Sequence, residues 1–409
     1  MDMPVTMLPG QSGQSRQAGG GACQDVLSGP ARTRWSDFAP GDCLFASQDE
    51  VLHGSGCLLS ADPRDHIQAC AAELLARAGA GQRGGPDAPP VLFGLLPYDP
   101  AQPARLLVPR QLRRMQPPAA LPASQAAGIR QRREHPSGDE YERGVRDALA
   151  LLDAGPALRK LVLARTLELR LDRDADVARI LGRLWHGNPH GYTYAMPLAG
   201  AGEYFIGASP ELLVRRRGRQ VSVHPLAGTA ARLPDPDGDA RAAQALLDSP
   251  KDRLEHAVVV EAIEAALRPL CRRLDIPARP SLTATARLWH LGTPIAGELE
   301  DPSRSVLDLA IALHPTPAVC GLPTADARRA IARIEPFERG FFAGAVGWCD
   351  ARGDGVWSVA IRCAHVAGPR LTLSAGAGIV PGSVPARERI ETGNKLRTLL
   401  DALGLESAP

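Results

Sequence analysis

Short apolar segments joined by tight turns recur through the second half of the chain and constrain its fold more than any other feature. They form two meanders, with strands expected at residues 204–206, 212–215 and 221–224, and at 343–349, 356–365 and 371–375. Glycines such as Gly218 and Gly353 mark the turns. A hairpin makes consecutive strands antiparallel, and long helical segments separate the meanders. The pattern therefore predicts an α+β fold with antiparallel sheets, not a doubly wound parallel sheet.

The domain organisation follows from where apolar residues are scarce. Residues 1–34 are rich in Gly, Gln and Ser, and we expect a flexible leader there. Residues 35–409 are expected to form one domain, because a chain of 409 residues with 44% hydrophobic content can bury a large core. A Pro-, Gln- and Arg-rich passage at 110–136 is predicted to be a long surface connection within that domain.

Charge and cysteine usage exclude several classes of partner. The net charge is +2 and no Lys/Arg block occurs, so we expect neither nucleic acid nor a membrane as partner. Eight cysteines include no CxxC pair, and no signal-peptide pattern stands at the N-terminus. These features favour a reduced, cytoplasmic protein that acts on a small molecule.

Lysine is rare enough to serve as a marker of chemistry. Of 47 Lys plus Arg residues only Lys160, Lys251 and Lys395 are lysines, which leaves 47 − 3 = 44 arginines. Arginine does not release its proton near neutral pH, whereas a lysine can do so or act as a compact charge. The three lysines are therefore candidates for functional roles. The alternative is that a general replacement of lysine by arginine missed these three positions by chance.

Two candidate acid-base groups lie at the ends of predicted strands. Lys160 begins a strand with two apolar faces, and desolvation would lower its pKa and suit it to act as a general base. The alternative is a lysine that reaches solvent from the strand end. Glu211 leaves a tight turn at 207–211, where a carboxylate is often simply solvated. Residues 225–229 are predicted to be an uncharged loop in which Gly228 permits close backbone approach to a ligand.

Three carboxylates indicate a cation site. Glu255 continues the apolar stripe of a helix capped by Ser249, so its carboxylate is expected to point inward and to need a partner. Glu388, Glu391 and Lys395 are spaced 3 and 4 apart on a second helix. The alternative for Glu391 and Lys395 is an ordinary surface ion pair between helix positions i and i+4. Carboxylate oxygens on two helices would suit Mg²⁺ better than zinc.

Two further features indicate contacts with substrate anions. A strand that glycines interrupt at its end, around residues 376–378, precedes the second helix and suggests a backbone that lines a ligand. Arg362 is predicted to share one strand face with the small residues Ser358 and Ala360, where it could grip a carboxylate with both nitrogens.

Many ordered motifs together resemble the chorismate-utilising enzymes, most closely the isochorismate synthases of catecholate siderophore pathways. The resemblance spans about residues 40–405 and is carried by 160–165 (KLVLAR), 207–211 (GASPE), 225–229 (PLAGT), 251–256 (KDRLEH), 313–318 (LHPTPA), 347–350 (GWCD), 361–364 (IRCA), 375–380 (AGAGIV) and 391–395 (ETGNK). It implies a single large domain of two antiparallel β-sheets packed together, with helices outside. In the family, lysine at position 160 together with alanine at position 227 marks the members that add water rather than ammonia.

The resemblance also implies roles for individual residues. Lys160 would deprotonate a water that attacks C2 of chorismate, and a protonated Glu211 would donate to the departing C4 hydroxyl. Mg²⁺ would be held by Glu255 and Glu391 with help from Glu388. The implied substrate-binding residues are Ala227, Gly228, Thr229, His290, Arg362, Gly376, Ala377, Gly378 and Lys395. His290 could instead be structural. Lys251 has no assigned catalytic role and is expected to pair with a nearby carboxylate.

Partners and alternatives complete the prediction. A water-adding member needs no glutaminase subunit, so a monomer is expected. Two other functions remain open at this point: a salicylate synthase, which would form isochorismate and then eliminate pyruvate, and a non-catalytic chorismate-binding module.

Overall fold

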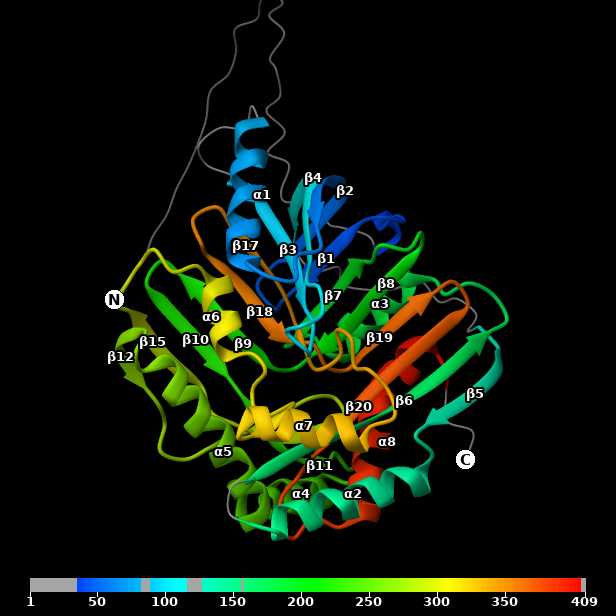
Figure 1. Cartoon of the computed structure of the whole chain (residues 1–409). Coiled ribbons are helices and arrows are strands. Elements are labelled where there is room, and N and C mark those ends of the chain that lie inside the picture. The colour runs from blue at the N-terminus through cyan, green and yellow to red at the C-terminus, as the bar shows by residue number, and fades with distance from the viewer. Residues whose placement is uncertain (1–34, 82–88, 116–126, 156–157, 406–409) are drawn as a thin grey trace, which may run out of the picture. The chain divides into compact units, whose positions relative to one another are not determined.

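The computed structural model describes residues 35–81, 89–115, 127–155 and 158–405 (Figure 1). The predicted leader at 1–34 lies outside the described residues. The described strands are β1 (Cys43–Ala46), β2 (Val51–Ala61), β3 (Val91–Leu96), β4 (Arg105–Met115), β5 (Ile129–His135), β6 (Lys160–Leu171), β7 (Tyr192–Pro197), β8 (Glu203–Ser209), β9 (Leu212–Arg217), β10 (Gln220–His224), β11 (Leu226–Ala231), β12 (Cys271–Asp275), β13 (Ser281–Ala284), β14 (Leu288–Gly292), β15 (Ile295–Leu299), β16 (Gly321–Leu322), β17 (Ala345–Asp350), β18 (Gly355–Val359), β19 (Cys363–Ala367) and β20 (Arg370–Ile379). The helices are the 3₁₀ turn η1 (Trp35–Asp37), α1 (Ile67–Gly81), α2 (Gly138–Asp153), α3 (Val177–Gly187), α4 (Pro236–Asp248), α5 (Pro250–Leu267), α6 (Val306–Leu313), α7 (Thr324–Ile334) and α8 (Pro385–Leu403).

Antiparallel pairing runs through the described strands as one continuous path. It passes from β12 through β15, β10, β9, β18 and β17 to β3, and then through β4, β2, β1, β7, β8, β19 and β20 to β6. The four N-terminal strands therefore link two halves of the sheet (Figure 1). A separate three-stranded sheet contains β11, β14 and β13. The predicted α+β class with antiparallel sheets is confirmed.

The two halves of this path bury apolar faces in a shared core. Phe93 of β3, Tyr194 of β7 and Trp357 of β18 are among its largest fully buried side chains. A second cluster lies where α3 and α8 cover β6, β8, β19 and β20, with Leu181 and Leu373 fully buried. Burial of this many apolar side chains is the main favourable contribution to folding.

The helix that carries Glu255 begins as its sequence predicts. The Ser249 side chain caps α5 by accepting from the backbone N–H of Asp252 at 3.3 Å, and Pro250 occupies the first turn. The helix α2 begins in a similar way, at a capping box formed by Ser137 and Glu140. Among the described residues, none of the helices combines the length and apolar character that crossing a bilayer requires.

Four local predictions are wrong. The passage at 110–136 is not one long connection, because β4 extends to Met115 and β5 begins at Ile129. Residues 226–229 belong to β11 instead of a loop, because they pair with β14. The glycines at 376–378 do not interrupt β20, which pairs with β6 without a break through Ile379.

The single strand expected at 356–365 is the fourth error. It is divided into β18 and β19, which pair with different neighbours, β9 and β8. Arg362 stands at the division with φ 51°. Its side chain therefore does not share a strand face with Ser358 and Ala360, because the alternation of faces ends with the strand.

Candidate active site

A polar cavity opens where β6, β20, β11, β14 and the segment between β18 and β19 come together. Its lining is Val162, Pro210, Glu211, Leu226, Ala227, Gly228, Thr229, Glu255, His290, Ala318, Val319, Phe342, Ala343, Ile361, Arg362, Ala375, Gly376, Gly378 and Lys395. Titratable side chains from five separate segments converge in it, so tertiary packing assembles the site.

Lys160 and Glu255 form a buried ion pair beside this cavity. The Lys160 Nζ lies 3.1 Å from Glu255 Oε1, and the lysine side chain is 0% exposed. Burial alone would raise the pKa of Glu255, but Lys160, Lys251 and Lys395 outweigh it and lower that pKa. Glu255 lines the cavity and Lys160 does not. The carboxylate thus belongs to the cavity lining, whereas its lysine partner is fully buried beside it.

Because Gly378 has no side chain, the Lys160–Glu255 pair can occupy the space beside it. A Cβ at position 378 would lie 2.0 Å from Glu255 Oε1 and 3.1 Å from Lys160 Cε. Gly378 pairs with Val162 in the β20–β6 ladder, two residues from Lys160. The glycine therefore allows a helix carboxylate to approach the strand backbone closely, which any larger residue would prevent.

Glu211 is a buried carboxyl group whose pKa lies near neutral pH. It is 3% exposed, and burial raises its pKa to about 7 despite the backbone N–H of Leu226 and the charges of Lys160, Lys395 and Arg362. A carboxyl group with such a pKa is protonated in a large fraction of molecules at pH 7 and can donate a proton.

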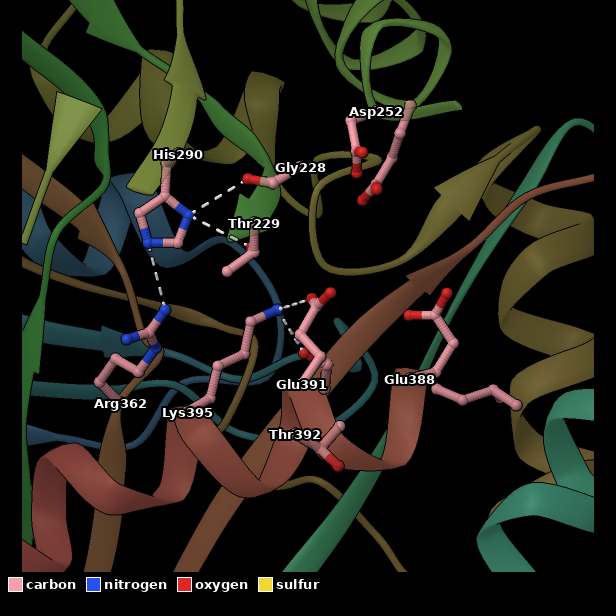
Figure 2. Close-up of polar contacts among 12 residues, drawn as sticks. Gly228, Thr229, Asp252, His290, Arg362, Glu388, Glu391, Thr392 and Lys395 are labelled. Carbon is pink, nitrogen blue, oxygen red and sulfur yellow. Dashed lines mark hydrogen bonds and ion pairs between the residues drawn. The ribbon is translucent and has the colours of Figure 1, made fainter. Parts of the chain in front are cut away.

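Arg362 is a buried guanidinium that faces the cavity without an ion pair to any of the described residues. Burial lowers its pKa to about 10, although Glu391 and Glu211 act in the opposite direction. Its Nη2 lies 3.4 Å from His290 Nε2, and His290 Nδ1 lies 3.3 Å from the carbonyl oxygen of Gly228 (Figure 2). A buried charge without a partner is costly, so this guanidinium is suited to receive an anionic ligand.

The neutral imidazole ring of His290 positions Arg362. Burial, followed by the charges of Arg362 and Lys395, lowers the pKa of His290 well below its usual range. With a proton on Nδ1 the ring donates to Gly228 O and accepts from Arg362 at Nε2. Gly228 makes its carbonyl available because it occupies a β-bulge with φ 76°.

Backbone strain is also concentrated at the cavity. Of the three described non-glycine residues with positive φ, Ala343 (φ 62°) and Arg362 (φ 51°) both line it. Such conformations cost about 1–3 kcal/mol each and persist where packing imposes them. Hydrogen bonds join the two segments, because Ala343 N donates to Ala360 O at 2.9 Å.

Each of the three lysines pairs with one of the three predicted metal-binding carboxylates. Besides the pair of Lys160 with Glu255, Lys251 Nζ lies 3.3 Å from Glu388 Oε1 and Lys395 Nζ lies 2.7 Å from Glu391 Oε1. The Lys395 Nζ also donates to Gly376 O at 2.8 Å. Figure 2 shows Glu391 and Glu388 on α8 pointing toward the end of α5 that carries Asp252. The pairing expected of Lys251 with a nearby carboxylate is thus confirmed, with Glu388 as the partner.

The donor chemistry of this cluster fits Mg²⁺. Burial and the charge of Glu391 raise the pKa of Glu388 to about 7, and burial raises that of Asp252 with contributions from Glu255 and Glu391. Carboxylates that repel one another in this way can share a hard cation. As they stand, no three metal-binding side chains among the described residues converge on one point, because each predicted ligand faces a lysine.

The structure separates the predicted site residues into two groups. Those that line the cavity are Glu211, Ala227, Gly228, Thr229, Glu255, His290, Arg362, Gly376, Gly378 and Lys395. Lys160, Ala377, Glu388 and Glu391 lie beside or behind the lining. Ala377 is 0% exposed and alternates with the two glycines, so it faces the core instead. Sequence reasoning missed Val162, Val319, Phe342, Ala343 and Ile361, which carry no chemical signal of their own.

Comparisons with known proteins agree with this picture. A family profile described as "Chorismate binding enzyme" matches residues 99–404. Isochorismate synthase DhbC of Bacillus subtilis is 43% identical over 90% of this chain and 95% of its own length. Isochorismate synthase EntC of Escherichia coli is 40% identical over 90% of this chain and 96% of its own length.

A solved structure gives the same result for the fold. The crystal structure of a DhbC from Bacillus anthracis, described as a 2,3-dihydroxybenzoate-specific isochorismate synthase, superposes with a TM-score of 0.85 and 41% identity. It covers 91% of this chain and 98% of its own.

Proposed function

Because this chain belongs to the family of chorismate binding enzymes, we propose that it is an isochorismate synthase that converts chorismate to isochorismate for siderophore synthesis. The observation that carries the proposal is one cavity lined by a protonatable buried acid, Glu211, and a buried arginine, Arg362, that has no ion-pair partner among the described residues. A reaction that exchanges one hydroxyl for another on a dianionic ring requires both kinds of group.

Substrate binding is assigned to the cations of the cavity. Arg362 can form a bidentate contact with a carboxylate of chorismate, and His290 fixes the plane of its guanidinium. Lys395 is held at the same cavity by Glu391 and Gly376 O, with a side chain 17% exposed. Together these two positive charges match the two carboxylates of the substrate.

Proton transfer is assigned to Glu211 and Lys160. Glu211 donates to the leaving C4 hydroxyl, since its pKa of about 7 keeps a protonated population at neutral pH. Lys160 accepts a proton from the water that attacks C2, for which its amine must be neutral and free of Glu255. The acid comes from the turn between β8 and β9 and the base from β6, so the two proton transfers are made by groups on separate segments.

We also propose that Mg²⁺ binds between α5 and α8. Glu255, Glu388 and Glu391 would hold the ion, which would neutralise and orient the ring carboxylate of the substrate. A carboxylate engaged in this way would leave its lysine partner.

The proposal is tested by incubating purified protein with chorismate and Mg²⁺ and identifying the product by chromatography and mass. Isochorismate is expected as the product. Accumulation of salicylate with pyruvate would reject the plain synthase in favour of a salicylate synthase. If no product formed while chorismate still raised the melting temperature, the chain would instead be a binding module.

We propose further that the protein acts in the cytoplasm as a monomer without a glutaminase subunit. Water needs no partner to supply it, in contrast to ammonia, and the cysteines among the described residues are free thiols. Size-exclusion chromatography with light scattering should give a mass near 43.3 kDa. A stable mass of twice that value would contradict the monomer.

A further inference from the structure

The strand that carries Lys160 has an edge that the sheet does not complete. On one side β6 pairs with β20 from residue 161 to residue 170. On the other side β16 pairs only with residues 160 and 161, and β5 begins to pair at Thr166. Between these two partners, residues 162–165 meet no described strand on that edge. Buried backbone groups there need hydrogen bonds from elsewhere.

Two side chains fill this gap in the ladder. Glu335, the C-cap residue of α7, accepts from the backbone N–H of Ala164 with its Oε1 at 2.7 Å. Arg339 donates through Nη2 to the carbonyl oxygen of Val162 at 2.7 Å. The two side chains also bind each other, with 2.8 Å between Arg339 Nε and Glu335 Oε2. The ion pair thus provides the donor and the acceptor that a neighbouring strand would provide (Figure 1 shows α7 beside β6).

The same pair reaches the lining of the cavity. Arg339 donates through Nη1 to the carbonyl oxygen of Val319 at 2.7 Å. Val162 and Val319 both line the cavity, and Val162 lies two residues after Lys160 on the same strand face. Phe342 and Ala343, also part of the lining, follow Arg339 in one loop. One guanidinium therefore holds the backbone at two separate points of the site.

Stability alone gives no reason for this arrangement. The side chains of Arg339 and Glu335 are 2% and 4% exposed. The desolvation of two such charges usually costs about as much as their attraction returns, and apolar replacements are often as stable. What a charged pair adds is direction, because each hydrogen bond holds a backbone group in one position.

We propose that Arg339 and Glu335 are positioning residues that hold β6, and with it the Lys160 amine, at the catalytic cavity. The proposal rests on the proposed isochorismate synthase activity, since it assigns Lys160 the role of base. Arg339 and Glu335 are not among the proposed substrate-binding groups, Arg362 and Lys395, which come from other elements. Loss of the pair should therefore affect turnover more than substrate binding.

The test uses the double variant Glu335→Gln/Arg339→Met, which removes both charges together and leaves no lone buried ion. The kcat should fall about tenfold or more, since small misplacements of catalytic groups are costly, while KM for chorismate changes less than about threefold. Hydrogen exchange at the amide of Ala164 should accelerate. Arg339→Lys keeps the charge but not the fork of donors, and should show a smaller loss of kcat.

The chain offers a matched control on its surface. Glu264 and Arg268 have the same i, i+4 spacing but are 40% and 59% exposed. The variant Glu264→Gln/Arg268→Met should therefore leave kcat, KM and exchange at Ala164 unchanged.

Two results would overturn the proposal. One is a lower melting temperature of the Glu335→Gln/Arg339→Met variant with kcat and Ala164 exchange as in the unmodified protein, which would mean a purely structural role. The other is a raised KM for chorismate with unchanged kcat in the same variant, which would mean a role in substrate binding. If the unmodified protein forms no isochorismate, the proposed function fails, and exchange at Ala164 still decides whether the pair holds β6.

Discussion

At the scale of single residues, the site is governed by which charges are paired and which are not. All three lysines face carboxylates, whereas Arg362 faces the cavity without an ionic partner among the described residues. Glu211 has no cation within ion-pair distance in the described part of the chain and keeps a raised pKa of about 7. The substrate and the metal ion would redistribute these charges, since both carry charge into the cavity.

Lys160→Arg tests the general base. Arginine keeps the positive charge beside Glu255 but does not release its proton, so kcat/KM should fall about 100-fold or more. The measurement is steady-state kinetics with chorismate and Mg²⁺. Arg159→Lys is the control, because Arg159 is 43% exposed in a surface pair with Glu261. Activity of Lys160→Arg within about threefold of the unmodified enzyme would remove Lys160 from the mechanism.

The raised pKa of Glu211 predicts the pH dependence. An acid catalyst works only while protonated, so kcat/KM should decrease as pH rises through about 7. In the complex, the negative charge of chorismate should move the same limb of kcat to higher pH, because a nearby anion disfavours ionisation. Glu211→Gln should abolish the limb along with most of the activity. A flat kcat/KM profile between pH 6 and pH 9 would contradict the role of Glu211.

At the scale of elements, strands and helices contribute different groups to the site. The strand β6 supplies Lys160, α5 supplies Glu255, and α8 supplies the Glu388, Glu391 and Lys395 set. The buried Arg165 of β6 joins α8 to the sheet through hydrogen bonds. It donates to Thr392 Oγ1 at 2.8 Å and to Arg389 O at 3.2 Å. The close approach of β20 to α5 depends on Gly378.

Gly378→Ala should disturb the site more than the fold. The added Cβ would lie 2.0 Å from Glu255 Oε1, so the carboxylate must move away from Lys160. Overpacking of this kind costs about 1–3 kcal/mol of folding free energy, and activity should fall about tenfold or more because the pair is displaced. Chemical denaturation and kinetics measure the two effects.

A control for this substitution is Gly187→Ala at the end of α3, where an added Cβ meets nothing within 4 Å. It should change neither stability nor activity appreciably. Equal loss of activity in both variants would show that the space beside Glu255 is not the cause.

At the scale of the whole molecule, the site exists because distant parts of the chain meet. The sheet runs through β1–β4 from one half to the other, and the cavity collects residues from position 162 to position 395. Binding at such a site stabilises the fold as a whole, because a ligand that binds only the folded chain shifts the unfolding equilibrium.

Mg²⁺ should therefore raise the melting temperature of the unmodified protein. At a concentration of 100 times its Kd, the added free energy of unfolding is about 2.7 kcal/mol. Glu391→Gln removes one proposed ligand and should reduce this shift together with Mg²⁺-dependent turnover. Differential scanning calorimetry with and without Mg²⁺ measures the effect. An identical shift in both proteins would exclude Glu391 from the metal site.

The sequence by itself determined the features that depend on neighbouring residues. The Ser249 cap predicted the start of α5, and turns at glycine predicted antiparallel strands. Local signals failed at Arg362, where a continuous apolar pattern hides the division between β18 and β19. Each half pairs with a different strand, and periodicity within a segment does not reveal which strand lies beside it.

Only the tertiary structure decided how the chemical groups are paired. It paired Glu255 of the cavity lining with the buried Lys160, paired Lys251 with Glu388, and completed the hydrogen bonds at the edge of β6 with Glu335 and Arg339. These partners are separated by up to 177 positions in the chain. The type of a residue fixes what chemistry it can do, but its pKa and its partner depend on burial and on charges that only packing brings near.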